Sequence, residues 1–232
     1  MNDFFSRFRP QATGVSLAEK VRSGLAGGIA ILVLGLVLHA LPQGSYQLVM
    51  LGSIAASAVL LFAVPHSPLA QPWNLVGGHL ISSLPGWWFG VWIHDPVLAG
   101  AAAVGAAIFL MYALHCLHPP GAATALTLVL ASQQFHPMGE LLALYIVAAN
   151  ALTFLILGLV INNLLPERRY PMPAATPAAP PKPGPFITLE SADIAWALTQ
   201  MDSTIDVSEE DLAIIYQRAL QHAQTRIEQK QS

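Results

Sequence analysis

The chain has 232 residues, of which 54% are hydrophobic and 10% are charged, and its formal net charge is -3. All ten basic residues lie outside the stretch from residue 23 to residue 167. This leaves no basic surface along which a nucleic-acid backbone would bind, so we expect no nucleic acid among its partners. Charged side chains are costly in hydrocarbon, and a basic-free stretch of this length therefore predicts a polytopic membrane protein whose first partner is the lipid bilayer.

Six apolar segments follow one another along the chain and determine the predicted fold. They cover roughly residues 23–41, 47–64, 74–93, 97–117, 119–135 and 139–165. Most of them approach a length of about 20 residues, which a spanning helix needs. The fifth is short and rich in small residues, so it either crosses steeply or enters and returns as a re-entrant half-helix. We predict an all-α transmembrane helix bundle with about six spans.

Basic residues on both sides of these segments indicate the orientation. Four precede the first segment and two follow the last: Arg7, Arg9, Lys20, Arg22, Arg168 and Arg169. The positive-inside rule places both termini in the cytoplasm, so the number of crossings is even. Six satisfies this condition, whereas a re-entrant fifth segment would require one more segment to stop short, leaving four. The tryptophans at positions 87, 88 and 92 then fall at the outer interface.

Small residues four positions apart recur within these segments. The pairs are Gly24 and Gly28, Ser53 and Ser57, and Ala101 and Gly105. Such spacing lets helix backbones approach each other where lipid provides no hydrophobic drive to associate, so we assign these residues to packing within the bundle. They also make a homo-oligomer the expected assembly. Asn150 is expected to face the interior and to hydrogen-bond a neighbouring helix.

The composition changes abruptly after Pro166 to a proline-rich sequence, which favours extended polyproline geometry. Residues 166–185 are therefore predicted as a semi-rigid linker. Beyond it, two stretches show helical apolar spacing, and Ser208 with Asp211 resembles a capping box. The predicted domains are a cytoplasmic segment over 1–22, a transmembrane domain over 23–165, this linker, and a small cytoplasmic helical hairpin over 186–232.

Two loops place a histidine next to prolines immediately before a new apolar segment. They read Pro65-His66-Ser67-Pro68 and His118-Pro119-Pro120-Gly121, and helices are expected to begin at about Asn74 and at Gly121. The N–H groups of a first helical turn have no partner and carry about half a positive charge per helix end, so an anion can bind there without lysine or arginine. The predicted substrate-binding residues are His118, Pro119, Pro120, Gly121, Thr124, His66, Ser67, Asn74 and His79.

The histidines also have structural explanations. His66 is equally well explained as a satisfied side chain at the headgroup interface, and His79 as a buried imidazole bonded to a backbone carbonyl. For His118 the constrained His-Pro-Pro-Gly sequence favours a functional role. The remaining polar residues near the predicted outer ends are expected to be solvated loop residues: His39, His94, Asp95 and His136.

The residues His115, Cys116 and His118 invite a metal interpretation, which their pattern does not support. His115 and Cys116 are adjacent and project differently, and the sequence has no HExxH and no paired CxxC. Neither a metal nor another cofactor is therefore predicted. An enzyme would need a nucleophile-base pair or a metal site, and the apolar stretch offers neither in recognisable form, so we expect no enzymatic activity.

The stretch SAVLLFAVPHSPLAQPWNLVGGHLISS, followed after one further span by LHPPGAATAL, resembles the HPP family of integral membrane proteins, which is named for the motif at His118, Pro119 and Pro120. The resemblance covers about residues 20–165. In the family Ala-Gly-Ala often follows the prolines, whereas this chain has Gly121-Ala122-Ala123. The tail ADIAWALTQMDSTIDVSEEDLAIIYQRALQHA is similar to the connector that leads into a pair of CBS domains in some bacterial members, and this sequence stops before any such domain.

The resemblance implies a small polytopic permease, with nitrite transport proposed for members in cyanobacteria and chloroplasts. Our hypothesis is a passive or proton-coupled pathway for a small inorganic anion, with nitrite as the leading candidate, in the bacterial inner membrane. The alternative is a membrane-anchored sensor or scaffold whose C-terminal hairpin binds a regulatory partner.

Overall fold

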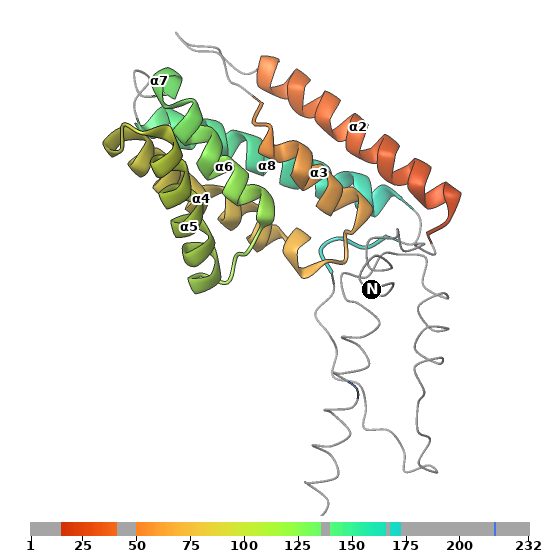
Figure 1. The fold of residues 1–232 in the computed structure, drawn as a ribbon. Coiled ribbons are helices and arrows are strands. Elements are labelled where there is room, and N and C mark those ends of the chain that lie inside the picture. Colours follow the sequence, from red (N-terminus) through yellow and green to blue (C-terminus); the bar gives the residue numbers. More distant parts are fainter. Residues whose placement is uncertain (1–14, 41–49, 136–139, 166–167, 173–215, 217–232) are drawn as a thin grey trace, which may run out of the picture. The chain divides into compact units, whose positions relative to one another are not determined.

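The computed structural model describes residues 15–40, 50–135, 140–165, 168–172 and 216. Each of the six predicted segments contains one helix of more than ten residues, which confirms the all-α fold. The predicted hairpin lies outside the described residues, apart from position 216, as do residues 173–185 of the linker. In chain order the elements are α2 (Leu17–Ala40), α3 (Ser53–Ala63), the 3-10 helix η1 (Pro68–Ala70), α4 (Pro72–Trp92), α5 (Pro96–Ala113), α6 (Pro119–Leu130), α7 (Ser132–Phe135) and α8 (Glu140–Leu164) (Figure 1).

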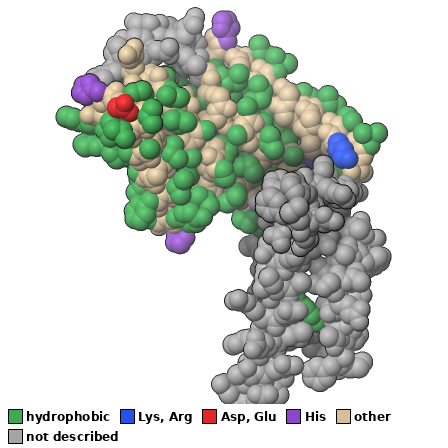
Figure 2. Space-filling view, in the orientation of Figure 1, with side chains coloured by type: hydrophobic (Ala, Val, Ile, Leu, Met, Phe, Trp, Pro, Cys, Tyr) green, Lys and Arg blue, Asp and Glu red, His purple; other side chains and the backbone are tan. Residues whose placement is uncertain are grey.

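The surface of the described bundle is suited to lipid. By length and composition, α2, α5 and α8 can each cross a membrane. Large apolar side chains cover the outside, for example Leu25 at 62% exposure and Phe109 at 70%. Figure 2 shows hydrophobic side chains over most of the visible face, with charged ones confined to small areas. The interior is mainly apolar as well, but it also holds a group of buried polar side chains that includes Ser57, His79 and His118.

Three non-helical segments, the start of α2 and the end of α8 lie at one end of the bundle. The Arg168 guanidinium, which follows α8, donates to Ser23 Oγ near the start of α2 at 2.9 Å. The Tyr170 hydroxyl donates to the Ala70 carbonyl between α3 and α4, and the Trp73 indole donates to the Leu114 carbonyl between α5 and α6. We call this the loop end, defined by residues 64–71, 114–118 and 168–172. The start of α2 and the end of α8 therefore lie at the same end of the bundle.

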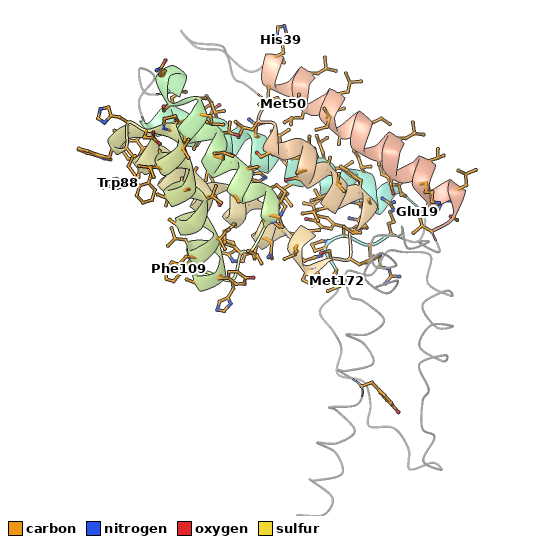
Figure 3. All side chains as sticks on the ribbon, viewed as in Figure 1. Glu19, His39, Met50, Trp88, Phe109 and Met172 are labelled. Carbon is orange, nitrogen blue, oxygen red and sulfur yellow. The ribbon has the colours of Figure 1, made fainter. Side chains whose placement is uncertain are left out.

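Aromatic side chains mark both ends of α4. Trp73 lies at the loop end and Trp92 at the opposite end, and both are more than half exposed. Nineteen residues separate them, or about 28 Å along a helix, close to the hydrocarbon thickness of about 30 Å. Trp88, on the outside of the last turns of α4, is also exposed and lies at the same end as Trp92 (Figure 3). Tryptophans in these positions fit the two membrane interfaces, so α4 has the length of a full crossing.

The helices α3 and α6 are too short to span a bilayer alone. They contain 11 and 12 residues, or about 16 to 18 Å at 1.5 Å per residue. The predicted second segment began at residue 47, but α3 begins at Ser53. The preceding backbone is buried at Leu51, whose N–H donates to Asn150 Oδ1 at 3.1 Å. Non-helical backbone is tolerated at membrane depth only where protein groups satisfy it. Asn150 is buried as predicted, but the bond that it accepts from Leu51 comes from the non-helical backbone before α3 and not from a neighbouring helix.

The helices α4 and α6 touch through their backbones. A Cβ atom added at Gly121 would lie 2.5 Å from the Gly78 carbonyl oxygen, and one added at Gly86 would lie 2.6 Å from the Ala125 carbonyl oxygen. The small residues of α4 that form this contact recur every four positions and include Ser82. Such a stripe permits close helix approach, and packing at this distance excludes any larger side chain.

Two of the three small-residue pairs predicted to pack within the bundle are wrong. A Cβ atom added at Gly24, Gly28 or Gly105 would meet nothing within 4 Å among the described residues, and Ala101 is exposed. Only Ser53 and Ser57 are buried. The spacing fails as a guide because it recurs on lipid-facing surfaces as well as on packed ones.

The close contact between α4 and α6 can be tested with a matched pair of substitutions. Gly86→Ala should lower the melting temperature of the purified protein, because the added methyl group meets backbone atoms that cannot rotate away, at a cost of about 1–3 kcal/mol. Gly105→Ala makes the same chemical change at an open position, where alanine favours helix over glycine. Thermal unfolding of both variants in the same detergent measures the difference. Equal melting temperatures would show that α4 and α6 are not packed this closely.

Candidate functional site

Five polar side chains from three helices are buried together inside the bundle. All are at most 3% exposed. We call them the buried polar chain: Ser53 and Ser57 on α3, His79 on α4, His118 at the start of α6, and Thr124 on α6. In a bilayer such groups have no water to bond, so each must find a protein partner. The arrangement brings together three of the predicted site residues, His118, His79 and Thr124.

The local sequence positions His118 at the start of α6. Proline disfavours helical backbone for the residue before it, and His118 is accordingly extended, with φ -140° and ψ 103°. Its ring therefore projects away from the axis of α6. Its Nε2 atom lies 2.8 Å from Ser57 Oγ, and its Nδ1 atom lies 2.8 Å from the Leu69 carbonyl oxygen of η1. The imidazole thus joins α3 to the loop between α3 and α4.

Two glycines bring His79 next to His118. A Cβ atom at Gly77 would lie 3.0 Å from Cys116 Cβ, and one at Gly78 would lie 2.4 Å from His118 Cβ. The loop before α6 can therefore lie directly on α4. The two imidazole centres are 5.1 Å apart, with the rings inclined by 66°.

His79 is bonded to hydroxyl groups on both sides. Its Nε2 atom lies 3.0 Å from Ser57 Oγ, and its Nδ1 atom lies 2.7 Å from Thr124 Oγ1. Thr124 Oγ1 in turn lies 2.8 Å from Ser53 Oγ. Ser57 therefore bridges the two histidines. His79 was expected to bond a backbone carbonyl, but it is His118 that does so, at Leu69.

When both histidines are neutral and all four of their ring nitrogens are hydrogen-bonded, the chemistry of the groups determines the direction of each bond to an imidazole. The Leu69 carbonyl can only accept, so His118 carries its proton on Nδ1 and accepts from the Ser57 hydroxyl on Nε2. Ser57 has then used its single proton, so His79 donates to it from Nε2. In this neutral state His79 accepts from Thr124 on Nδ1, which leaves Thr124 Oγ1 to accept from Ser53, whereas the hydroxyl orientation in the structure has Thr124 donating to Ser53 Oγ. The two histidines are therefore opposite tautomers.

The remaining predicted site residues lie apart from this chain. The ring of His66 is partly exposed, and the described residues offer it no hydrogen bond. Ser67 Oγ accepts from the Leu69 N–H at 3.2 Å and caps η1. The Asn74 amide donates to the Leu117 carbonyl at 2.8 Å and holds the loop before α6. Of the two prolines, Pro119 is exposed and Pro120 is buried.

The sequence reasoning missed three members of the site. Ser53 and Ser57 were assigned to packing only, although a hydroxyl in an apolar helix always needs a partner. The third is Ser82, which is fully buried and whose Oγ has no hydrogen-bond partner among the described residues. It lies 2.9 Å from the position that a Gly121 Cβ would occupy. Leaving a buried hydroxyl unsatisfied costs about 1–3 kcal/mol, so Ser82 is an exception among the buried polar groups described.

The sequence His115-Cys116 shapes the backbone before α6. His115 is exposed and has a positive φ of 53°. Its N–H donates to the Tyr112 carbonyl, and the Cys116 N–H donates to the Met111 carbonyl, which together form the Schellman motif that ends α5. The Cys116 side chain is buried while that of His115 faces outward. The described residues contain no group of three or more His, Cys, Asp and Glu that would hold a metal.

The segment after α8 holds η1 in place. The Tyr170 hydroxyl donates to the Ala70 carbonyl at 2.7 Å, next to the carbonyl that binds His118. The Met172 N–H donates to Gln71 Oε1, and the Gln71 amide donates to the Pro65 and Ser67 carbonyls. Burial raises the pKa of the Tyr170 phenol, so this group remains a donor at neutral pH. Residues 168–172, predicted as part of the linker, are thus bonded to the bundle.

The polar residues at the opposite end form no part of this site. His39 and His94 are exposed, and His39 lies at the far end of the bundle from Met172 (Figure 3). Asp95 accepts from the Val97 and Leu98 N–H groups and caps α5. His94 is exposed between α4 and α5 as predicted, His39 is exposed but lies in the last turn of α2 rather than in a loop, and His136 lies outside the described residues.

Comparison with known proteins places the chain in a family. The sequence model described as HPP, transmembrane region, matches residues 12–171. Two transmembrane proteins of Dictyostelium discoideum are each 40% identical to the chain, one over 154 residues (65% of this chain) and one over 152 residues (64%). The chain spans about half the length of these relatives, 49% and 53%. No solved structure matches it. The family match and the buried His118 of the His-Pro-Pro motif agree, and the chain belongs to the HPP family of integral membrane proteins.

Proposed function

We propose that the chain is a permease that carries a small inorganic anion, nitrite, across the bacterial inner membrane, with both termini in the cytoplasm. The observation that supports it best is the buried polar chain within a bundle whose outside is apolar. Ionisable side chains are expensive at membrane depth and are usually retained there for function. The substrate comes from the family resemblance, and the orientation from the basic residues that flank the spans.

The short helices α3 and α6 support a transport role. Both begin inside the bundle, with α6 beginning where Gly121 contacts Gly78, the seventh residue of α4. Transporters place substrate sites at the ends of such interrupted helices, because the positive helix N-terminus attracts anions. A chain with no lysine or arginine between residues 23 and 167 needs this kind of attraction.

The structure changes which groups are expected to donate hydrogen bonds to an anion at the start of α6. Pro119 and Pro120 have no N–H group, and the Gly121 N–H donates to the His118 carbonyl at 2.7 Å. The start of α6 therefore offers fewer free N–H groups than the sequence predicted. The His118 imidazole and the unpartnered Ser82 hydroxyl, both near Gly121, are the groups that we propose for binding the anion.

Nitrite uptake into proteoliposomes tests this proposal. We expect uptake by the wild-type protein above that of empty vesicles, and a loss of about tenfold or more in His118→Asn, because that change removes a bond worth roughly 1–3 kcal/mol at the site. His115→Asn is the matched control, since it changes an exposed histidine of the same loop and asparagine tolerates its positive φ. Uptake should be measured at two pH values with equal amounts of folded protein.

Two results would contradict the proposal in different ways. Uptake no greater than in empty vesicles at either pH would exclude nitrite as the substrate. Protein-dependent uptake that His118→Asn leaves unchanged would keep the permease but remove His118 from its mechanism.

A second candidate function is a membrane-anchored sensor or scaffold whose C-terminal hairpin binds a regulatory partner. The observation that favours it is the bonding of Tyr170 and Met172, which lead into the tail, to the loop that holds His118. A signal arriving at the tail therefore has a physical path to the buried polar chain.

Deletion of residues 186–232 distinguishes the two functions. A self-contained permease should keep its nitrite flux per folded protein, because Tyr170 and Met172 remain in place. A scaffold should lose its partner, which co-purification from native membranes would measure. Loss of flux together with intact folding would favour the sensor.

A further inference from the structure

We propose that the buried polar chain is a proton relay that ends at His118, and that a proton delivered through it accompanies the transported anion. The relay rests on the hydrogen-bond geometry alone. Its coupling to an anion rests on the proposed permease function.

The hydrogen bonds of the buried polar chain have a second arrangement, in which the five side chains together hold one more proton than in the neutral arrangement. A proton arriving at Ser53 Oγ allows the Ser53 proton to move to Thr124 Oγ1, and the Thr124 proton to move to His79 Nδ1. His79 then passes its Nε2 proton to Ser57 Oγ, and Ser57 passes its own to His118 Nε2. One proton enters and one positive charge appears on His118, while every other group keeps its number of protons. The bonds involved are all between 2.7 and 3.0 Å long.

Ser57 makes this exchange cooperative. Its single hydroxyl proton can be donated to only one of the two imidazoles at a time. The tautomer of His79 is therefore linked to the charge of His118. A second proton on His79 would place two positive charges on rings whose centres are 5.1 Å apart, which a low-dielectric interior disfavours.

The relay has a fixed end. The Leu69 carbonyl accepts from His118 but cannot take a proton, so the positive charge stays on the imidazole until a bound anion takes the proton and leaves with it, which returns His118 to its neutral form. The other terminus, Ser53, follows the non-helical residues 50–52, which lead in from the opposite end of the bundle. In the proposed relay, protons move from Ser53 toward His118 and the loop end.

Among the described residues, no carboxylate lies beside His118 to balance a positive charge on its imidazole. The element α3 contributes only Ser53 and Ser57, α4 contributes His79, and α6 contributes Thr124. The loops contribute the Cys116 thiol and the partly exposed ring of His66, with the Tyr170 phenol bonded to Ala70. Arg168 bonds Asn162 and Ser23. Asp95 caps α5 at the opposite end, and Glu19 lies in the first turn of α2.

The described residues place no carboxylate beside His118, and this is the reason that proton and anion would move together. A cationic imidazole at membrane depth is costly unless a negative charge lies beside it. An anion bound at the start of α6 would supply that charge, and the protonated histidine would supply the attraction that the anion lacks elsewhere. Together they carry no net charge across the hydrocarbon.

Solid-state NMR of the full chain in lipid bilayers, with nitrogen-15 in its histidines, tests the relay without any anion. At neutral pH we expect the Nδ1–H tautomer at His118 and the Nε2–H tautomer at His79. On acidification His118 should become cationic, and His79 should change in the same step to the Nδ1–H tautomer while it remains neutral. The same tautomer at both sites, or an unchanged His79 when His118 is charged, would overturn the relay.

Ser57→Ala interrupts the chain and keeps both histidines. It should abolish the change of tautomer at His79 and lower nitrite flux. Ser57→Thr, which keeps the hydroxyl, should restore both and guards against a general loss of folding. Ser83→Ala is the matched control, because Ser83 is also a buried serine but donates only to the Leu80 carbonyl of its own helix. A Ser57→Ala protein that behaves like Ser83→Ala in both measurements would overturn the relay.

Proteoliposomes with a pH-sensitive dye inside test the coupling. We expect one proton to move with each nitrite ion, beyond the signal of empty vesicles. Nitrite flux without proton movement would overturn the coupling and leave the permease intact. A linked tautomer change without any nitrite flux would support the relay and overturn only the proposed substrate.

Discussion

The contact between the backbones of α4 and α6 is the constraint on which the rest of this structure depends. The hydrocarbon interior offers no partner to a polar side chain, so each must lie within hydrogen-bond reach of another protein group. Helices separated by ordinary side chains lie too far apart for two imidazoles and three hydroxyls to form a continuous chain. Gly78 and Gly121 remove that separation, because a methyl group at either position would lie within 2.5 Å of the opposite helix or loop. Helix packing and site chemistry therefore have one cause.

The short helices extend this reasoning to the depth of the site. His79 lies six residues beyond Trp73, about 9 Å along α4 from the aromatic residue that marks the interface. The start of α6 lies at the same level, since Gly78 contacts Gly121. Further in, α3 begins where Asn150 satisfies the Leu51 N–H. The buried polar chain thus lies between the short helices α3 and α6 and the longer helix α4.

The sequence predicts the fold better than it predicts the site. Long apolar segments and flanking prolines locate the helices, because membrane insertion depends on composition over about 20 residues. The choice of His118 rests on a local backbone effect, which proline imposes by itself. By contrast, the pairing of Ser57 with two histidines depends on how α3 lies against α4, and no local pattern contains that information. The same limit explains why Gly105 was assigned to packing although it faces open space, while the stripe that includes Gly86 was overlooked.

The bonds of Tyr170 and Met172 also decide where the membrane unit stops as a module. The last long helix ends at Leu164, but the family match continues to residue 171, and the bonds to η1 continue to Met172. A tail grafted at Leu164 would remove the donors that hold η1 and, with it, the carbonyl that orients His118. A tail grafted after Met172 would inherit an intact unit. The natural junction for exchanging C-terminal parts between relatives therefore lies eight residues beyond the end of the helix.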